Sequence, residues 1–375
     1  MNKLIFRMLL IIITSLSVCF FPGYGPYFAA NADKMKGIPP RLAADYIHAV
    51  IEADRKIYSD IIVDRLGRAI SLEATENWRE EDTLLLPAQF LMESSNLSNL
   101  RGVGMKYRLL SLWPINKENS AKTETEKIAL QEVIKNPDKP FTWIVQAGGT
   151  WYFQAIYPDK AITQSCVSCH NSHPKSPKKD FKEGDVMGGI FINLPLGRHE
   201  YKIGEGKYLL PPEVVSDYIH SILDSDRYIY SKYIVDRLQS KNLLHASEAW
   251  KDENASPLPA QFLLIASRWI KRKNLGLDFR LISLWPINPQ NGPANEFERV
   301  GLESVSIHPV RPYIGQTQLG NKHYFQAIYP DFAVAPSCVA CHNAHPNSPK
   351  RDFKFNDVMG GIAVTLDLSD RKRKR

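Results

Sequence analysis

The amino-acid sequence predicts an α+β fold in two tandem domains, each an antiparallel sheet with helices on one side. Three observations predict this fold. The chain has 375 residues, more than a single hydrophobic core usually serves. A shift of 172 positions aligns the sequence with itself, so one architecture occurs twice. Each copy begins with helical periodicity and ends with strands joined by turns, an order typical of α+β domains.

The two copies match closely in several segments. Ser111–Asn116 falls on Ser283–Asn288, and 20 of the 29 residues from Gln164 to Ile192 match their counterparts. Copies that perform the same chemistry should share the residues that perform it, so we expect the chemistry among the shared residues. The histidine pairs present in both copies are His48/His220, His170/His342 and His173/His345.

Residues 1–32 have the pattern of a cleaved secretory signal. Lys3 and Arg7 make the start positive, and the apolar run Leu9–Phe21 is too short to span a bilayer comfortably. Ala30-Asn31-Ala32 supplies a small-x-small cleavage site. An uncleaved anchor and a lipoprotein box at Cys19 are the alternatives. We expect a periplasmic or otherwise extracytoplasmic protein without stable membrane insertion.

These patterns divide the chain into five parts. After the signal peptide (1–32), the first domain covers residues 33–196 and the second covers residues 211–369. A polar stretch that contains glycine, residues 197–210, is the predicted linker. Residues 370–375 form a basic tail, which we expect to be solvated; contact with an acidic partner or an anionic surface is the alternative.

The first half of each copy is predicted to be helical. In the first copy, apolar residues at helical spacing predict a long helix over residues 40–66. Pro87 suits the first turn of a second, short helix. The capping box Thr123-x-x-Glu126 predicts a helix that ends near Lys135.

The second half of the copy is predicted to form the sheet. Strands are expected over Tyr107–Trp113, Phe141–Ala147 and Trp151–Tyr157, with Gly148-Gly149 as a hairpin turn between the last two. A polar loop is then expected to hold the cysteines, before a closing strand over Met187–Leu194.

The four cysteines beyond residue 32 lie in two C-x-x-C-H motifs, the signature of c-type haem attachment. Two thiols three residues apart can reach the two vinyl groups on one edge of a porphyrin. The next histidine is then held under the iron. We therefore predict two covalently bound haem c groups, one per copy. Their attachment residues are Cys166, Cys169, Cys338 and Cys341, and the proximal iron ligands are His170 and His342.

Other uses of C-x-x-C fit less well. Zinc sites usually take two such pairs roughly 15–20 residues apart, whereas these pairs are 172 residues apart. A thioredoxin-like pair opens a helix at a βα junction, whereas we expect this motif in a loop. A structural disulfide would not explain why a histidine, His170 or His342, follows each cysteine pair.

Several further segments occur in both copies, including Asp45-Tyr46-x-His48, Leu86-Pro87-Ala88-Gln89 and Asp185-Val186-Met187-Gly188-Gly189. Together with the cysteine motif, they resemble the c-type haem family with a PAS-like domain that was first described in cyanobacteria. This family is also found as the extracytoplasmic sensor part of bacterial histidine kinases and chemoreceptors. The resemblance covers nearly all of the chain beyond the signal. It implies a PAS-like fold with one covalent haem per copy, and it implies no enzyme activity.

The sequence pattern does not single out the sixth iron ligand. In part of the resembled family a cysteine fills the position, but this chain has no spare cysteine after cleavage. We predict His48 and His220, which lie at the edge of an apolar helix face in both copies. A core histidine, an open or water-bound iron and ligation by Met187 are the alternatives. His173 is only three residues beyond His170, roughly 10 Å of extended chain, which is poor reach around a macrocycle.

The propionates of a haem need cations or hydrogen-bond donors. Shared arginines in apolar or aromatic segments are the candidates, although the first of them could instead pair locally with Asp54 or Glu52. Trp113 and Tyr152-Phe153 could wall the haem, but strand aromatics belong to the core by default. The candidate arginines are Arg55, Arg227, Arg108 and Arg280.

These observations predict an extracytoplasmic dihaem c-type cytochrome that transfers electrons to a redox partner protein. The alternative is a redox- or gas-sensing module that acts through a separate signalling receptor. A haem peroxidase or reductase is a weaker third class, so we do not expect an enzyme. The formal net charge of +7 is not gathered into a stripe of Lys and Arg, so we expect no nucleic-acid binding.

Overall fold

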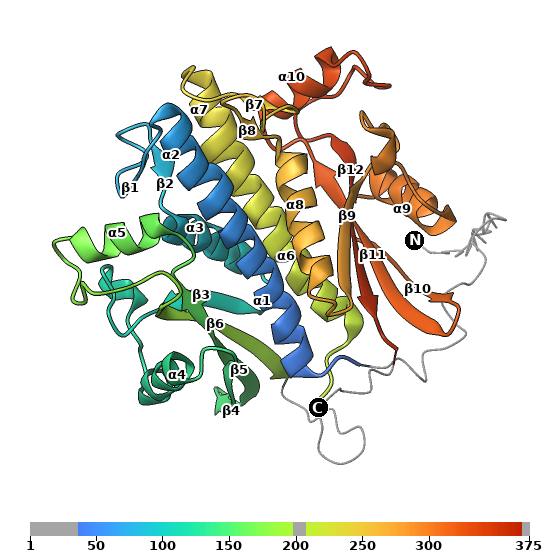
Figure 1. The fold of residues 1–375 in the computed structure, drawn as a ribbon. Helices are drawn as coiled ribbons and strands as arrows, with labels where there is room; N and C mark the ends of the chain where they lie inside the picture. Colours follow the sequence, from blue (N-terminus) through green and yellow to red (C-terminus); the bar gives the residue numbers. More distant parts are fainter. Residues whose placement is uncertain (1–36, 198–207, 370–375) are drawn as a thin grey trace, which may run out of the picture. The chain divides into compact units, whose positions relative to one another are not determined.

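The computed structural model describes residues 37–197 and 208–369 (Figure 1). The predicted signal peptide (1–32), the predicted tail (370–375) and most of the predicted linker (197–210) lie outside the described residues. Among the described residues, no helix combines the length and the apolar character needed to cross a membrane.

The first repeat places its longest helices before a four-stranded sheet. The helical elements are α1 (Pro40–Ile57), the π-helix η2 (Tyr58–Asp64), α2 (Arg65–Ile70), α3 (Pro87–Leu100), the 3-10 helix η3 (Lys117–Asn119), α4 (Glu124–Lys135) and α5 (Gln164–Ser172). The strands are β1 (Ala74–Thr75), β2 (Leu84–Leu85), β3 (Lys106–Leu110), β4 (Phe141–Ala147), β5 (Thr150–Lys160) and β6 (Val186–Gly197).

The second repeat has the same order of elements. Its helical elements are α6 (Pro212–Ile229), the π-helix η4 (Tyr230–Asp236), α7 (Arg237–Ser240), α8 (Pro259–Arg272), the 3-10 helix η5 (Pro289–Asn291), α9 (Glu296–Ile307) and α10 (Pro336–Ala344). Its strands are β7 (Ala246–Ser247), β8 (Ser256–Pro257), β9 (Leu277–Ile282), β10 (Tyr313–Leu319), β11 (Lys322–Phe332) and β12 (Val358–Asp367).

Most of the predicted elements are confirmed. The helix predicted over residues 40–66 is continuous, although it widens near its C-terminal end into the π-helix η2 and then extends to Ile70 as α2. Thr123 and Glu126 form the predicted capping box of α4. The Gly148-Gly149 turn has φ angles of 55° and 76°, which glycine adopts without strain, and it joins β4 to β5. The strand predicted over Tyr107–Trp113 ends earlier, at Leu110.

Each four-stranded sheet is antiparallel, with the order β3-β6-β5-β4 in the first repeat and β9-β12-β11-β10 in the second, whereas the short pairs β1-β2 and β7-β8 are parallel. Alternate residues of a strand point to opposite faces, and both faces are covered. On one face, Ile190 and Ile192 of β6 join the large core formed with α1 and α3. On the other face, Phe191 packs with Leu130 of α4. The predicted α+β fold is confirmed with the long helices on one face, and the shorter α4 adds a layer on the opposite face.

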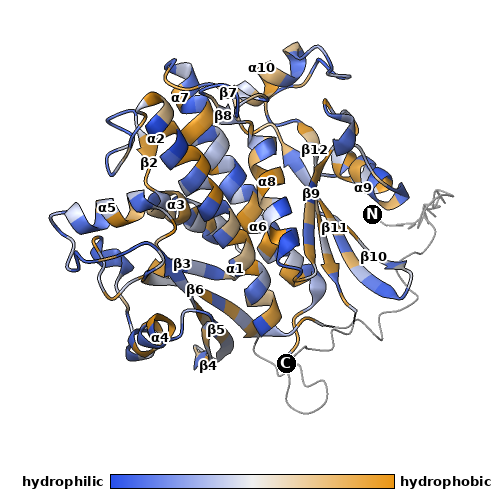
Figure 2. Cartoon of the chain, viewed as in Figure 1, coloured by the Kyte–Doolittle hydropathy of each residue, from blue (hydrophilic) through white to orange (hydrophobic). Residues whose placement is uncertain are grey.

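The two repeats share one continuous core. Helix α1 packs against α6 and α8, and α3 packs against α6 (Figure 1). These helices carry hydrophobic residues along their length, and the largest buried cluster contains side chains from both repeats (Figure 2). Equivalent residues Ile38 and Leu210 pair with each other ahead of α1 and α6, so the contact is approximately symmetric.

Candidate functional site

The C-x-x-C-H motif of the first repeat lies on helix α5, not in the polar loop that we expected. Thr163 caps the helix, because its side chain accepts a hydrogen bond from the backbone N–H of Cys166. Residues three and four apart share one face of a helix. Cys166, Cys169 and His170 therefore lie on the same face, and Val167 points into a small core. The equivalent motif lies on α10, which has a proline in its first turn.

The motif does open a helix directly after a strand, so its position no longer argues against a redox dithiol. The pKa of the thiols does argue against one. Burial raises the pKa of the Cys169 and Cys341 thiols, with the neighbouring carboxylates Glu76 and Glu248 as the next cause. Reactive dithiols need a lowered thiol pKa, so the surroundings of these cysteines favour a thiol that is not ionised.

The three motif residues of the first repeat line one pocket of about 1470 Å³. Pockets for drug-sized ligands hold roughly 300–1,000 Å³, so this one suits a larger group. The pocket walls come from α5, the π-helix η2, α3 and the ends of β3 and β6. Apolar wall residues include Val63, Leu72, Leu86, Met92, Trp113 and Met187. The size, the apolar lining and the donor set on α5 fit a haem attached to Cys166 and Cys169.

His170 has the properties of a metal-binding imidazole. Its ring meets the ring of Phe181 edge-on, with 6.0 Å between the centroids. Asn171 holds Phe181 in place with hydrogen bonds of 2.9 and 3.0 Å to its backbone. Burial lowers the pKa of His170, helped by the positive charge of Arg55. The imidazole is therefore neutral and keeps the lone pair that a metal needs. His342 repeats the contact, 5.9 Å from Phe353.

Arg55 and Arg227 are held by buried carboxylates. Arg55 lines the pocket and donates a hydrogen bond of 3.1 Å to Asp159 on β5, which also lines it. Arg227 and Asp331 form the equivalent ion pair at 3.1 Å. The Nε atom of each arginine is buried without a hydrogen-bond partner. Each of these predicted propionate-binding arginines therefore keeps its Nε–H without an acceptor. The charge of each is already balanced by the aspartate that it binds.

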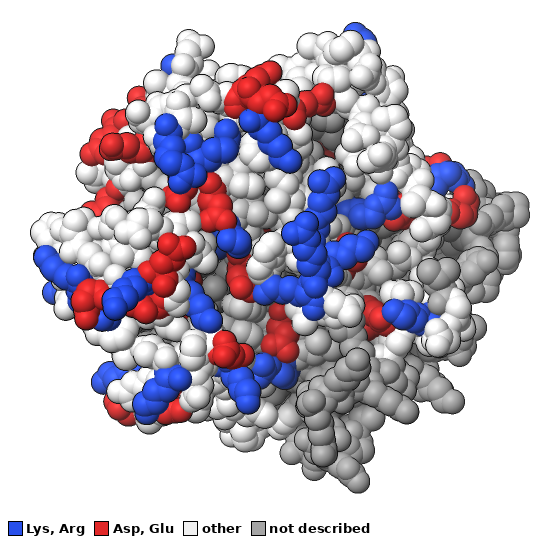
Figure 3. Space-filling view, in the orientation of Figure 1, with Lys and Arg blue, Asp and Glu red and all other residues white. Residues whose placement is uncertain are grey.

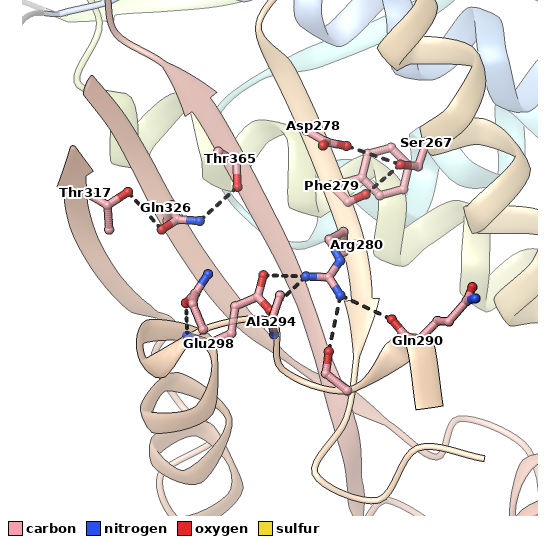
Figure 4. A network of polar contacts seen from close by, with 12 residues as sticks. Ser267, Asp278, Phe279, Arg280, Gln290, Ala294, Glu298, Thr317, Gln326 and Thr365 are labelled. Atoms are coloured by element: carbon pink, nitrogen blue, oxygen red, sulfur yellow. Dashed lines mark hydrogen bonds and ion pairs between the residues drawn. The ribbon is translucent and has the colours of Figure 1, made fainter. Parts of the chain in front are cut away.

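Arg108 and Arg280 lie away from the pocket lining. Arg108 alternates with Leu109 along β3, so it projects to the face covered by α4 and binds Glu126 at 2.6 Å. Figure 4 shows the same arrangement in the second repeat, where Arg280 points toward Glu298. The two Arg280–Glu298 hydrogen bonds are 2.8 and 2.9 Å long. The structure does not bring these two arginines to the motif.

His48 and His220 stack on tyrosines of the sheet. His48 lies flat on Tyr157 with 4.0 Å between centroids, and its Nδ1 atom is 3.6 Å from Glu52. His220 lies on Tyr329 at 3.9 Å. Burial lowers the pKa of His48 to about 3 and that of His220 to about 4, so both rings are neutral. His48 does not line the pocket, and its ligation of iron stays a prediction.

Two other candidate ligands do line the pocket. His173 ends α5, where its Nδ1 accepts a hydrogen bond from the backbone of Lys175 and its Nε2 lies 3.4 Å from Glu76. Met187 begins β6 and packs with Val167 and Phe181. Both residues recur in the second repeat as His345 and Met359.

The sequence reasoning missed the π-helix that lines the pocket. Ser59, Val63 and Asp64 project from η2 into the lining, and the Oδ1 atom of Asp64 is buried without a partner. Rare π-helical turns occur frequently at functional sites. A usable signal was present, because all three residues recur in the second repeat as Ser231, Val235 and Asp236.

Comparison with known families finds one match, and it covers both repeats. The Tll0287-like family model matches residues 41–195 and again residues 214–366. No curated protein matches the chain. No solved structure matches it either.

Proposed function

The chain belongs to the Tll0287-like family, whose model matches it twice, and on this premise we propose that it is an extracytoplasmic dihaem c-type cytochrome. The observation that carries the proposal is the placement of Cys166, Cys169 and His170 on one helix face in a large apolar pocket. The same three residue types recur on α10 of the second repeat.

Each residue of the proposed haem site has a separate role. Haem, when bound, supplies one-electron chemistry between ferric and ferrous iron. Cys166 and Cys169 would tether it through thioether bonds, and His170 would bind the iron. Trp113 lines the pocket, and the ring of Phe181 supports it edge-on from behind, with 5.7 Å between the centroids. Arg55 would donate to a propionate.

Electron transfer is the proposed activity, with a redox protein as partner. Lys and Arg side chains gather over α8 in Figure 3. Arg268, Lys271 and Arg272 of this helix are exposed, whereas the equivalent positions of α3 hold Asn96, Asn99 and Leu100. Such a basic patch attracts a partner with an acidic face and speeds their encounter.

A redox- or gas-sensing module that acts through a separate receptor is the second candidate. The volume of the pocket favours it, because about 1470 Å³ leaves room for a small ligand beside the iron. Spectra of the matured protein separate the two functions. Electron transfer predicts low-spin iron in both oxidation states and no binding of CO or NO. A five-coordinate ferrous iron that binds either gas would contradict it and support sensing.

The sixth ligand is tested by His48→Ala. With His48 as the predicted ligand, we expect this variant to shift one haem toward high spin. His170→Ala is the positive control and should lose the low-spin spectrum of one haem. A His48→Ala spectrum that matches that of the unmodified protein would remove His48 as a ligand, in agreement with its place on Tyr157 outside the pocket lining.

A further inference from the structure

A pair of carboxylic acids is buried where the two repeats meet. Asp54 of α1 and Asp226 of α6 are 1% and 4% exposed, and they occupy equivalent positions of the two copies. Both side chains line one small cavity, and neither oxygen of the Asp54 carboxyl has a hydrogen-bond partner among the described residues. A buried carboxylate without a donor is costly, so this geometry favours a protonated acid.

The surroundings decide which acid keeps the proton. Ser94 of α3 donates to Asp226, and Ser94 also lies 2.9 Å from the hydroxyl of Tyr107 on β3. The second repeat has Ala266 and Phe279 at the equivalent positions and offers no such donors. Asp226 therefore has a donor beside it, whereas Asp54 has none among the described residues, which favours Asp226 as the ionised member and Asp54 as the protonated one.

The pair has little electrostatic compensation. Among the described residues, no lysine or arginine forms an ion pair with either acid; the arginines that follow them in the chain, Arg55 and Arg227, bind Asp159 and Asp331. Burying a carboxyl group without a cation disfavours its charged form. Burial is the main cause that raises the pKa of Asp54 well above its usual range, and the neighbouring Asp226 raises it further. Burial also raises the pKa of Asp226 to about 6, although its contacts with Asp54 and Ser94 act to lower it. Two acids this close titrate as a coupled pair.

Arg55 connects this pair to the pocket. It follows Asp54 in the chain, and it lines a small cavity together with Asp54, Asp226 and Tyr107. It also lines the pocket that contains His170, and its charge acts on that imidazole. Arg227 acts on His342 in the same way. One arginine therefore lies between each motif and the acid pair, so a change of charge at the motif changes the electrostatic potential at the acids.

We propose that Asp54 and Asp226 form a proton-binding site between the repeats that takes up a proton when a haem is reduced. The step rests on the proposed function. A one-electron donor, either the redox partner or dithionite in the test, converts ferric to ferrous iron. One proton from solvent then binds the carboxylate of Asp226, so one electron and one proton enter together.

The test uses the matured full-length protein and its Asp226→Asn variant. Reduction potentials are measured from pH 5 to pH 8 with dithionite as reductant. We expect the potential of at least one haem to fall as the pH rises through about 6, and we expect Asp226→Asn to remove most of this slope. Asp138→Asn is the matched control, because Asp138 is 92% exposed, and it should keep the slope. An equal slope in all three proteins overturns the coupling.

A second measurement needs no haem. A protonated carboxylic acid has its own infrared carbonyl band, which we expect at neutral pH in the unmodified protein and in Asp138→Asn but not in Asp54→Asn. Absence of the band from the unmodified protein overturns the protonated acid. A matured protein that contains no haem but shows the band overturns the proposed function and the coupling but supports the acid pair, so the two failures are distinguishable.

Discussion

Replacement of Cys166 and Cys169 together by serine is expected to halve the covalently bound haem of the matured protein. Both thiols lie on one face of α5 and line the pocket, and the sequence of the first repeat contains no other cysteine that could form a thioether bond. The second motif, on α10, should be unaffected. Intact mass and the absorbance of the haem in alkaline pyridine measure the content directly.

Two controls accompany this variant. Ser168→Ala changes a residue between the two cysteines and should keep both haems, because a serine hydroxyl forms no thioether. The double replacement of Cys338 and Cys341 should remove the other haem and leave the first. Full haem content in the Cys166/Cys169 double variant would show that these thiols do not attach it.

Arg237→Ala is expected to lower the free energy of unfolding by about 3 kcal/mol, from the loss of hydrogen bonds to buried backbone carbonyls and of packing. Arg237 follows the π-helix η4 and reaches across to the first repeat. It donates to the carbonyls of Trp78, at 3.1 Å, and of Thr83, and it lies over the Trp78 ring at 4.9 Å. Arg65 makes the equivalent contacts with Trp250 and Ala255.

Denaturant unfolding of the matured protein measures this effect. Arg299→Ala is the control, because Arg299 pairs with Glu296 and Glu303 on the exposed side of α9 and should contribute nothing measurable. Equal stability of the two variants would show that the contact across the repeats does not hold them together.

Much of the fold was accessible from the sequence because its signals are local or repeated. The shift of 172 positions reveals the duplication, the Thr123–Glu126 capping box marks the start of α4, and Gly148-Gly149 marks the hairpin. The helix under the cysteines was not accessible. Helix α5 has only nine residues, follows a strand and precedes a polar, proline-containing segment, so its local pattern resembles that of a loop.

The chemistry of the site was partly accessible for the same reason. The C-x-x-C-H spacing identifies its three residues without a structure, because the haem imposes it. The direction of Arg108 depends on the register of β3, and the Asp54–Asp226 contact depends on how two helices from different repeats cross. Neither the direction of Arg108 nor the contact between the two aspartates depends on local sequence, so neither could be predicted from the sequence pattern.

The account depends most on covalent haem in both repeats. The measurement that tests it is the intact mass of the purified, matured protein together with its spectrum in alkaline pyridine. The account predicts a mass increased by two haem groups and the spectrum of a haem with both vinyl groups saturated. A colourless protein, or one whose mass includes no porphyrin, would contradict it.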